Sequence, residues 1–379
     1  MKPKAVYIHV PFCEQICHYC DFNKFFLEKQ PVDEYLQLCV EEMKHTVKNT
    51  PPDEIASVYV GGGTPTSLTT SQLQLLLEGI KAYFPLRTSC EWTVEVNPGS
   101  AGREKLEMMR SQGVNRLSIG AQTFDPGLLH AIGRDHQAED VEKTVRMARG
   151  AGFENISIDL MFGLPGQTME QFKDTLQRVM ALSVEHVSAY SLKIEPKTVF
   201  YHLWKKGSLL LPEEDTEVEM YEELCSHLKK TGFIQYEISN FAKMGRQSRH
   251  NLTYWNNEEY YGIGAGAHSY LSGIRRMNHG PLPKYMESIR KCGLPYREEH
   301  RVTVQEKMEE EMFMGLRRLS GVSYATFSQK FGITINEVFP GVVEQLMKKN
   351  LLEDTGAAVR LTKNGLLLGN DVFEQFLLS

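Results

Sequence analysis

The first 235 residues alternate six times between a short apolar segment and an amphipathic helical segment. The strand-like segments span 5–10, 55–60, 91–96, 116–121, 156–162 and 186–192, and the first of them is rich in β-branched residues. The segments with helical spacing follow them at 32–47, 73–80, 104–111, 138–149, 169–182 and 213–230. Such alternation is typical of a parallel sheet, and right-handed crossovers close six units into a barrel or an open part of one. We therefore predict an α/β fold built on a partial (β/α)6 barrel.

Two further regions follow the alternating part. Residues 236–300 are rich in aromatic residues and glycine and show no clear period, so we predict a connecting region there. Residues 301–379 show helical patterns at 306–319, 324–331 and 335–349, and a hairpin pattern at 351–361. Helices followed by a hairpin predict an α-rich, winged-helix-like C-terminal domain. The predicted domains are thus 1–235, 236–300 and 301–379.

The charge balance argues against nucleic acid as a partner. The chain carries 42 Lys and Arg against 48 Asp and Glu, a net charge of −6, which gives no general attraction for nucleic acid or anionic lipid. The C-terminal region has nine Lys and Arg against ten Asp and Glu, whereas a DNA-binding wing should be basic. We expect that region to be an interaction surface or a lid.

The N-terminus and the longest uncharged segment bear on localisation. The first apolar run is too short for a signal peptide. The uncharged stretch 55–77 contains Gly, Thr, Ser, Gln and a proline, which is not the composition of a transmembrane segment. We expect a cytoplasmic protein without a transmembrane segment.

Three of the seven cysteines lie within eight residues, after the first predicted strand. In a reducing compartment, the spacing Cys13-x3-Cys17-x2-Cys20 indicates metal binding before disulfides. Thiolates suit zinc or an iron–sulfur cluster. Structural zinc usually takes four ligands, and His9 or His18 would have to be the fourth. A [4Fe–4S] cluster held by three cysteines leaves one iron open. Three unmodified buried thiols are the remaining alternative.

The cysteine spacing, with Tyr19 just before the last cysteine, resembles the motif of the radical S-adenosylmethionine (SAM) enzymes. The segment 61–65, Gly-Gly-Gly-Thr-Pro, is similar to the glycine loop of that family. The resemblance implies that Cys13, Cys17 and Cys20 bind a [4Fe–4S] cluster whose open iron binds SAM. It also implies that one electron from the cluster, supplied by an electron donor that the sequence does not identify, releases a 5′-deoxyadenosyl radical from SAM.

The resemblance also implies a set of cofactor contacts. The residues that match are Tyr7 and Tyr19 beside the cluster, Gly62, Gly63 and Thr64 in the glycine loop, and Glu95, Gln122, Arg134 and Asp159 at SAM. These fit the mouth of a barrel, where ligands bind at the C-terminal ends of strands. From residue types alone, Glu95 and Asp159 could instead form buried ion pairs with Arg134 or Arg116, and Gln122 could be a core amide.

The residues that surround the cysteines resemble two related groups within the radical SAM enzymes. The segments 7–13, Tyr-Ile-His-Val-Pro-Phe-Cys, and 20–23, Cys-Asp-Phe-Asn, resemble oxygen-independent coproporphyrinogen III oxidases and their relatives, the HemW haem chaperones. The oxidases carry a further cysteine where this chain has Phe22, and an N-terminal extension before the first strand. The chaperones share the motif His-Asn-x-x-Tyr-Trp, which residues 250–255 match in full.

On the basis of these sequence matches, the chain is identified as a member of the HemW family. Membership implies that it binds haem and transfers it to an acceptor protein that the sequence does not identify. The alternative is oxidase activity, the radical decarboxylation of propionate side chains.

The predicted haem contacts lie between residues 236 and 276. Aromatic side chains offer flat apolar surface to a porphyrin, and arginines could pair with its propionates; the residues are Phe241, Tyr254, Trp255, Tyr260 and Tyr261, and Arg246, Arg249, Arg275 and Arg276. His250 is the predicted axial ligand, with His268 as the competing ligand. Alternatively, His250 and Asn251 cap a loop under the barrel, and Tyr254 and Trp255 belong to the core.

Overall fold

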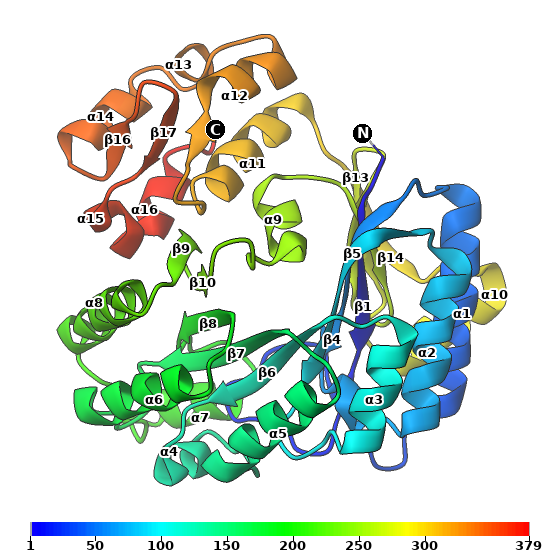
Figure 1. The fold of residues 1–379 in the computed structure, drawn as a ribbon. Coiled ribbons are helices and arrows are strands. Elements are labelled where there is room, and N and C mark those ends of the chain that lie inside the picture. The colour runs from blue at the N-terminus through cyan, green and yellow to red at the C-terminus, as the bar shows by residue number, and fades with distance from the viewer. Residues whose placement is uncertain (1, 379) are drawn as a thin grey trace.

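A twelve-stranded sheet dominates the computed structural model, which describes residues 2–378. The first residue of the predicted N-terminal domain and the last residue of the predicted C-terminal domain therefore lie outside the described residues. Six neighbouring parallel strands form the centre of the sheet: β1 (Ala5–Val10), β4 (Ile55–Gly62), β5 (Leu86–Val96), β6 (Arg116–Gln122), β7 (Asn155–Phe162) and β8 (His186–Ser191). They are the six predicted strands, in chain order. Figure 1 shows that they curve into an open barrel.

Helices cover the outer face of this curved sheet (Figure 1). Six of them match the predicted segments: α1 (Val32–Asn49), α2 (Thr70–Tyr83), α3 (Arg103–Gln112), α5 (Ala138–Gly150), α6 (Met169–Ala181) and α8 (Glu214–Lys230). Leu73, Leu76, Leu77 and Ile80 share one face of α2 and are buried, as their spacing predicts. The short helices α4 (Pro126–Ala131) and α7 (Val199–Lys205) contain too few turns to show a period. Among residues 2–378, none of the helices has the length and apolar character needed to cross a bilayer.

The region without a clear period extends both edges of the sheet. Two short strands, β9 (Ile234–Glu237) and β10 (Asn240–Ala242), continue the sheet beyond β8. The chain then passes through α9 (Arg249–Trp255) to the other edge, where four strands continue it beyond β1: β11 (Tyr260–Ile263), β12 (His268–Leu271), β13 (Ile274–Asn278) and β14 (Tyr296–Arg301). Helix α10 (Leu282–Cys292) packs against α1. In Figure 1, α9 lies on the concave side of the barrel.

The C-terminal region has a hydrophobic core of its own. Its elements are α11 (Val304–Gly315), β15 (Val322–Ser323), α12 (Tyr324–Phe331), α13 (Ile335–Val338), α14 (Val342–Lys348), β16 (Leu352–Asp354), β17 (Ala358–Leu361), α15 (Lys363–Leu367) and α16 (Gly369–Glu374). The predicted helix at 335–349 is two helices, because Pro340 cannot continue a helix and Gly341 adopts φ +77°. The predicted hairpin is present, and β15 pairs with it to make a three-stranded sheet.

Candidate functional site

One cavity of about 1410 Å³ runs along the concave side of the barrel to the C-terminal region. The three clustered cysteines line one end of it, and Tyr254 and Trp255 of α9 line another part. Binding sites for one small molecule typically measure about 300–1,000 Å³. This cavity therefore has room for more than one small ligand.

The loop that carries the cysteines is held in place by contacts with distant parts of the chain. Its base is closed by parallel pairing of β2 (Phe12–Cys13) with β3 (Phe25–Phe26). In its middle, the backbone N–H of His18 donates to the carbonyl of Ile132, and the N–H of Phe200 donates to the carbonyl of His18, both at 3.0 Å. Near its end, Nδ2 of Asn23 donates to the carbonyl of Ala265 at 2.8 Å. These bonds fix the loop that presents the thiols to the cavity.

The three thiols have polar neighbours that suit a cluster. Oγ1 of Thr64 donates to Sγ of Cys13, and Nη1 of Arg134 donates to Sγ of Cys17, both at 3.6 Å. Burial raises the pKa of the Cys13 thiol to about 11 and also raises that of Cys20. Thiolate ligands suit iron–sulfur clusters, and the guanidinium beside Cys17 places a positive charge near them. Within residues 2–378, no three His, Cys, Asp or Glu side chains converge on a single-ion site.

The remaining four cysteines lie elsewhere in the fold. Cys39 and Cys90 are buried, Cys225 is half-buried and Cys292 is exposed. They are not among the residues that line the cavity. The structure therefore brings together the same three thiols that the spacing singled out.

The glycine loop packs tightly against the first strand and the cysteine loop. Gly62 has φ +114°, and a Cβ there would lie 2.4 Å from the ring of His9. A Cβ on Gly63 would lie 2.8 Å from the backbone of Phe12. The N–H of Thr64 donates to the carbonyl of Phe12 at 2.7 Å. Packing within the chain therefore requires glycine at both positions. The sequence analysis explained these glycines only by a close approach to SAM.

Two carboxylates line the cavity between the strand ends. Glu95 accepts a hydrogen bond from the hydroxyl of Tyr59 at 2.8 Å and one from the N–H of Gly62 at 3.0 Å. Asp159 accepts from Oγ of Ser118 at 2.9 Å. Burial raises the pKa of Glu95 to about 7 and also raises that of Asp159.

Neither carboxylate forms the buried ion pair that sequence alone left open. Arg134 donates to a backbone carbonyl and a cysteine, and Arg116 donates to Thr93. No ion pair joins Glu95 or Asp159 to either arginine within the described chain. Both carboxylates line the cavity and are held there by hydrogen bonds to hydroxyl and backbone N–H groups.

Residues in the same part of the cavity wall keep buried polar atoms without a partner in the described part of the chain. Nη2 of Arg134 donates to the carbonyl of Gly120, whereas its Nε is buried and has no partner among the described residues. Gln122 lines the cavity at a bulge of β6, with φ +64°. Oδ1 of Asn97 is also buried, without a partner, in the cavity wall. A wall with such groups fits a ligand that carries ammonium, hydroxyl and carboxylate groups, as SAM does.

Asn97 was missed as a site residue by the sequence analysis. It comes two residues after Glu95, at the C-terminal end of the same strand, and that position is the signal that could have found it.

The two predicted tyrosines beside the cluster differ in position. Tyr19 lines the cavity and packs on an apolar cluster that includes Ile132 and Phe200. Tyr7 lies behind the cavity wall, where its hydroxyl hydrogen-bonds to Nδ1 of His9 at 2.9 Å and its ring stacks on Tyr59.

The His-Asn-x-x-Tyr-Trp motif forms α9, and its residues have different surroundings. Tyr254 and Trp255 line the cavity, whereas His250 is buried behind them, 1% exposed. Nδ1 of His250 is 3.2 Å from Oγ of Ser57, and its Nε2 is 2.8 Å from the hydroxyl of Tyr254. Burial lowers the pKa of His250 to about 3, so the ring is neutral. In this arrangement His250 positions Tyr254.

Three further residues predicted to contact haem, His268, Arg275 and Arg276, do not line the cavity. His268 is exposed on β12 and does not line the cavity. Arg275 pairs with Glu310 at 2.7 Å, and Arg276 pairs with Glu299 at 2.6 Å. The sequence analysis missed Arg317, which lines the cavity and stacks on the ring of Trp255 at 4.5 Å. No local motif marks that contact, since it joins α9 to the C-terminal region.

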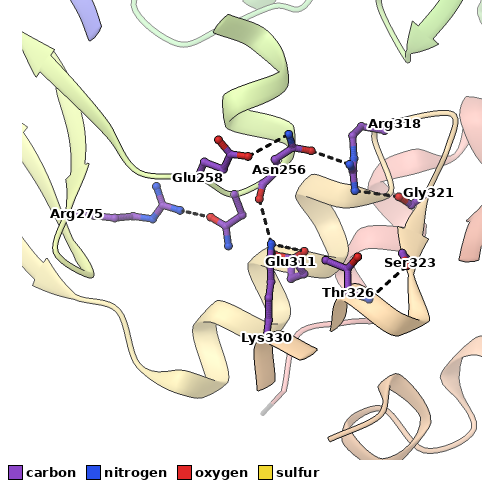
Figure 2. A network of polar contacts seen from close by, with 10 residues as sticks. Asn256, Glu258, Arg275, Glu311, Arg318, Gly321, Ser323, Thr326 and Lys330 are labelled. Carbon is purple, nitrogen blue, oxygen red and sulfur yellow. Dashed lines mark hydrogen bonds and ion pairs between the residues drawn. The ribbon is translucent and has the colours of Figure 1, made fainter. Parts of the chain in front are cut away.

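A polar network holds the end of α9 against the C-terminal region (Figure 2). Nη1 of Arg318 donates to Oδ1 of Asn256 at 2.6 Å. Nζ of Lys330 donates to the carbonyl of Asn256 at 3.4 Å and pairs with Glu311 at 2.8 Å. The residue after Trp255 therefore fixes the position of this cavity wall relative to α11 and α12.

Comparison with known proteins places the chain in a family. Residues 7–179 match the radical SAM superfamily, and residues 302–368 match the HemN C-terminal domain. The chain is 50% identical to a protein of Bacillus subtilis (strain 168) named Heme chaperone HemW, over 99% of both chains. It is 42% identical to a protein of the same name from Lactococcus lactis, over 100% of this chain and 98% of the relative.

A solved structure shares the fold. Coproporphyrinogen III oxidase (HemN) from Escherichia coli, described as a radical SAM enzyme, matches 99% of this chain and 90% of its own, with a TM-score of 0.87 and 23% identity. The predicted fold class is confirmed: a partial radical SAM barrel followed by a C-terminal domain.

Proposed function

The chain belongs to the HemW family of haem chaperones, and from this membership we propose that it binds haem and transfers it to an acceptor protein. The observation that carries the proposal is the position of Tyr254 and Trp255. Both belong to the chaperone motif and both line the cavity that also contains the three cysteines.

We propose that Cys13, Cys17 and Cys20 hold a [4Fe–4S] cluster. SAM would lie beside it, against Gly62, Gly63, Thr64, Glu95, Gln122, Arg134 and Asp159. The unpartnered polar atoms of Arg134 and Asn97 support this placement. When bound, the cluster supplies one electron to SAM, so an electron donor is a further partner in this proposal.

Haem is the proposed cargo, and its place is the part of the cavity lined by α9. Trp255 and Tyr254 offer aromatic surface from one side. Apolar side chains of the C-terminal region line the same cavity: Leu366, Leu367, Leu368 and Phe373. Leu367 and Leu368 are 37% and 48% exposed and adjoin the other two, so they offer a contiguous apolar surface to an apolar ligand.

The sequence predicts that His250 is the axial ligand of the haem iron. In the structure, a hydrogen bond of His250 would have to break first. Its Nε2 is occupied by the hydroxyl of Tyr254, so that hydrogen bond must open before the nitrogen can reach iron. We retain His250 as the proposed ligand with that condition. Its variant His250→Ala should then change the Soret maximum of bound haem, whereas His268→Ala should not.

The decisive experiment offers the reconstituted protein two porphyrins under anaerobic, reducing conditions. We expect a saturable Soret shift with haem, transfer of that haem to an apo-haemoprotein, and no consumption of coproporphyrinogen III. Consumption of coproporphyrinogen III with release of carbon dioxide would support the oxidase alternative instead. Failure to bind haem would contradict the proposal.

A further inference from the structure

A buried arginine in the barrel lacks the partners that such a residue normally has. Arg116 is 1% exposed and lines the cavity. Its single hydrogen bond to the described part of the chain runs from Nη1 to Oγ1 of Thr93 and is long, at 3.4 Å. Its Nε has no partner within residues 2–378. A guanidinium has five N–H donors, and burying them unpaired is costly.

We propose that Arg116 binds a carboxylate of the ligand that occupies this part of the cavity, a haem propionate. This inference rests on the proposed function and adds a specificity-determining contact to it.

The neighbouring ionisable groups leave this guanidinium available. Oε1 of Glu91 is occupied by the N–H groups of Arg249 and His250, at 2.9 and 3.3 Å. Asp159 accepts from the hydroxyls of Ser118 and Ser157. These two carboxylates offset part of the buried charge through space, and neither takes up the donors of Arg116.

The two histidines that face Arg116 are also satisfied. His186 bonds Oγ of Ser157 at 2.8 Å and the hydroxyl of Tyr236 at 2.9 Å. His250 bonds Ser57 and Tyr254. Both rings are neutral because burial lowers their pKa values, so neither repels the guanidinium nor pairs with an anion.

The position of Arg116 separates its ligand from SAM. Arg116 is the first residue of β6 and Gln122 the last, so their backbones are about 20 Å apart at a strand rise of about 3.3 Å per residue. Most of the proposed SAM contacts lie at the end with Gln122, whereas Asp159 is bonded to Ser118 in the middle of β6. Arg116 lies at the opposite end, where α9 supplies Tyr254 and Trp255 to the same cavity. Because Arg116 lies at the end of the cavity lined by α9, we assign its carboxylate to the molecule that rests against α9, and SAM binding is measured beside haem binding in the test.

The planar guanidinium of an arginine suits a carboxylate, because two of its N–H groups can donate parallel hydrogen bonds to the two carboxylate oxygens. The bond would satisfy donors that the protein leaves free and would orient one edge of the porphyrin toward the barrel interior. Esterification of the propionates removes the negative charge and should remove this contact.

The test compares haem with haem dimethyl ester in Soret titrations. Wild-type protein should bind haem at least about tenfold more tightly than the ester, since hydrogen bonds to charged groups contribute that much. Arg116→Met should bind haem about tenfold more weakly and the ester as the wild type does. Arg146→Met, at a surface arginine, should behave as wild type with both ligands.

Each other result has a defined meaning. Equal haem affinity in Arg116→Met and wild type, or equal weakening with both ligands, would overturn the role of Arg116. Loss of SAM binding without loss of haem binding would assign the carboxylate to SAM and also overturn it. If wild-type protein binds no haem, the proposed function fails and this inference with it.

A second variant covers the case in which Arg116→Met does not fold. Arg116→Lys keeps the charge and loses the fork, so its preference for haem over the ester should shrink without vanishing. An unchanged preference in folded Arg116→Lys would overturn the inference.

Discussion

The two ends of the cavity are built in different ways. At one end a single loop supplies all three cysteines, and backbone hydrogen bonds from His18 and Phe200 hold that loop in place. At the other end the wall combines Trp255 from α9 with Arg317 and Phe373 from the C-terminal region. A local sequence motif can specify the first arrangement. The second exists only after distant segments have packed together, so its chemistry is decided by the tertiary fold.

The largest expected effect concerns the cysteine end. Cys17→Ser should abolish the iron and sulfide content of anaerobically reconstituted protein, because two remaining thiolates cannot hold the cluster. Cys225→Ser is the matched control, since that cysteine lies outside the cavity. Iron and sulfide analysis measures both. Equal loss of iron in the control would contradict the assignment.

The glycine loop provides the next effect. Gly63→Val should lower the free energy of unfolding by about 3 kcal/mol or more, because its Cβ would lie 2.8 Å from backbone atoms of Phe12. Gly150→Ala, which meets nothing within 4 Å, should change stability by about 1 kcal/mol or less. Denaturant unfolding of the cluster-free protein measures both changes. A stable Gly63→Val that has lost only SAM binding would favour the original interpretation of this glycine.

The pKa of Glu95 predicts a pH dependence at the SAM end. This pKa is raised to about 7, so the side chain is mostly protonated at pH 6 and mostly ionised at pH 8. SAM carries a permanent sulfonium charge and should prefer the carboxylate, so its affinity should rise about tenfold between these values. Calorimetry on Glu95→Gln should show no such rise. An equally steep rise in that variant would assign the dependence to another group.

The smallest effect concerns the contact between α9 and the C-terminal region. Asn256→Ala removes the acceptor of Arg318 and should cost about 1 kcal/mol. Amide hydrogen exchange should quicken in α11 and α12, while the central barrel strands keep their protection. Glu258→Ala, whose bond to Asn256 is 3.4 Å long, should have a weaker effect. Uniform destabilisation of the whole chain would show that Asn256 does not act at this contact.

Sequence patterns predicted the central fold because its elements are long and regular. All six barrel strands and their six covering helices were found, since each spans enough residues to show a period. Strands β9 to β13 were not found, because segments of three to five residues are too short to show a period, and β14 was not found because four of its six residues are charged. The break at Pro340 was predictable from proline chemistry and was overlooked.

In the candidate site, too, local sequence predicted some features and missed those that depend on distant contacts. The cysteines, Glu95, Gln122, Arg134 and Asp159 all line the cavity, because strand ends meet at one barrel mouth. Sequence could not show that both nitrogens of His250 are occupied, or that Arg317 stacks on Trp255. Those facts depend on partners far away along the chain.

The most direct test of haem binding in this cavity compares two tryptophans. Trp255 lines the cavity, whereas Trp204 is 52% exposed on α7 and is not among the lining residues. Haem titrations of Trp255→Ala and Trp204→Ala, followed by the Soret band, measure the affinity of each variant. The account predicts at least about tenfold weaker binding for Trp255→Ala and wild-type binding for Trp204→Ala. Unchanged affinity in Trp255→Ala, with loss in Trp204→Ala, would place haem outside the cavity and contradict the account.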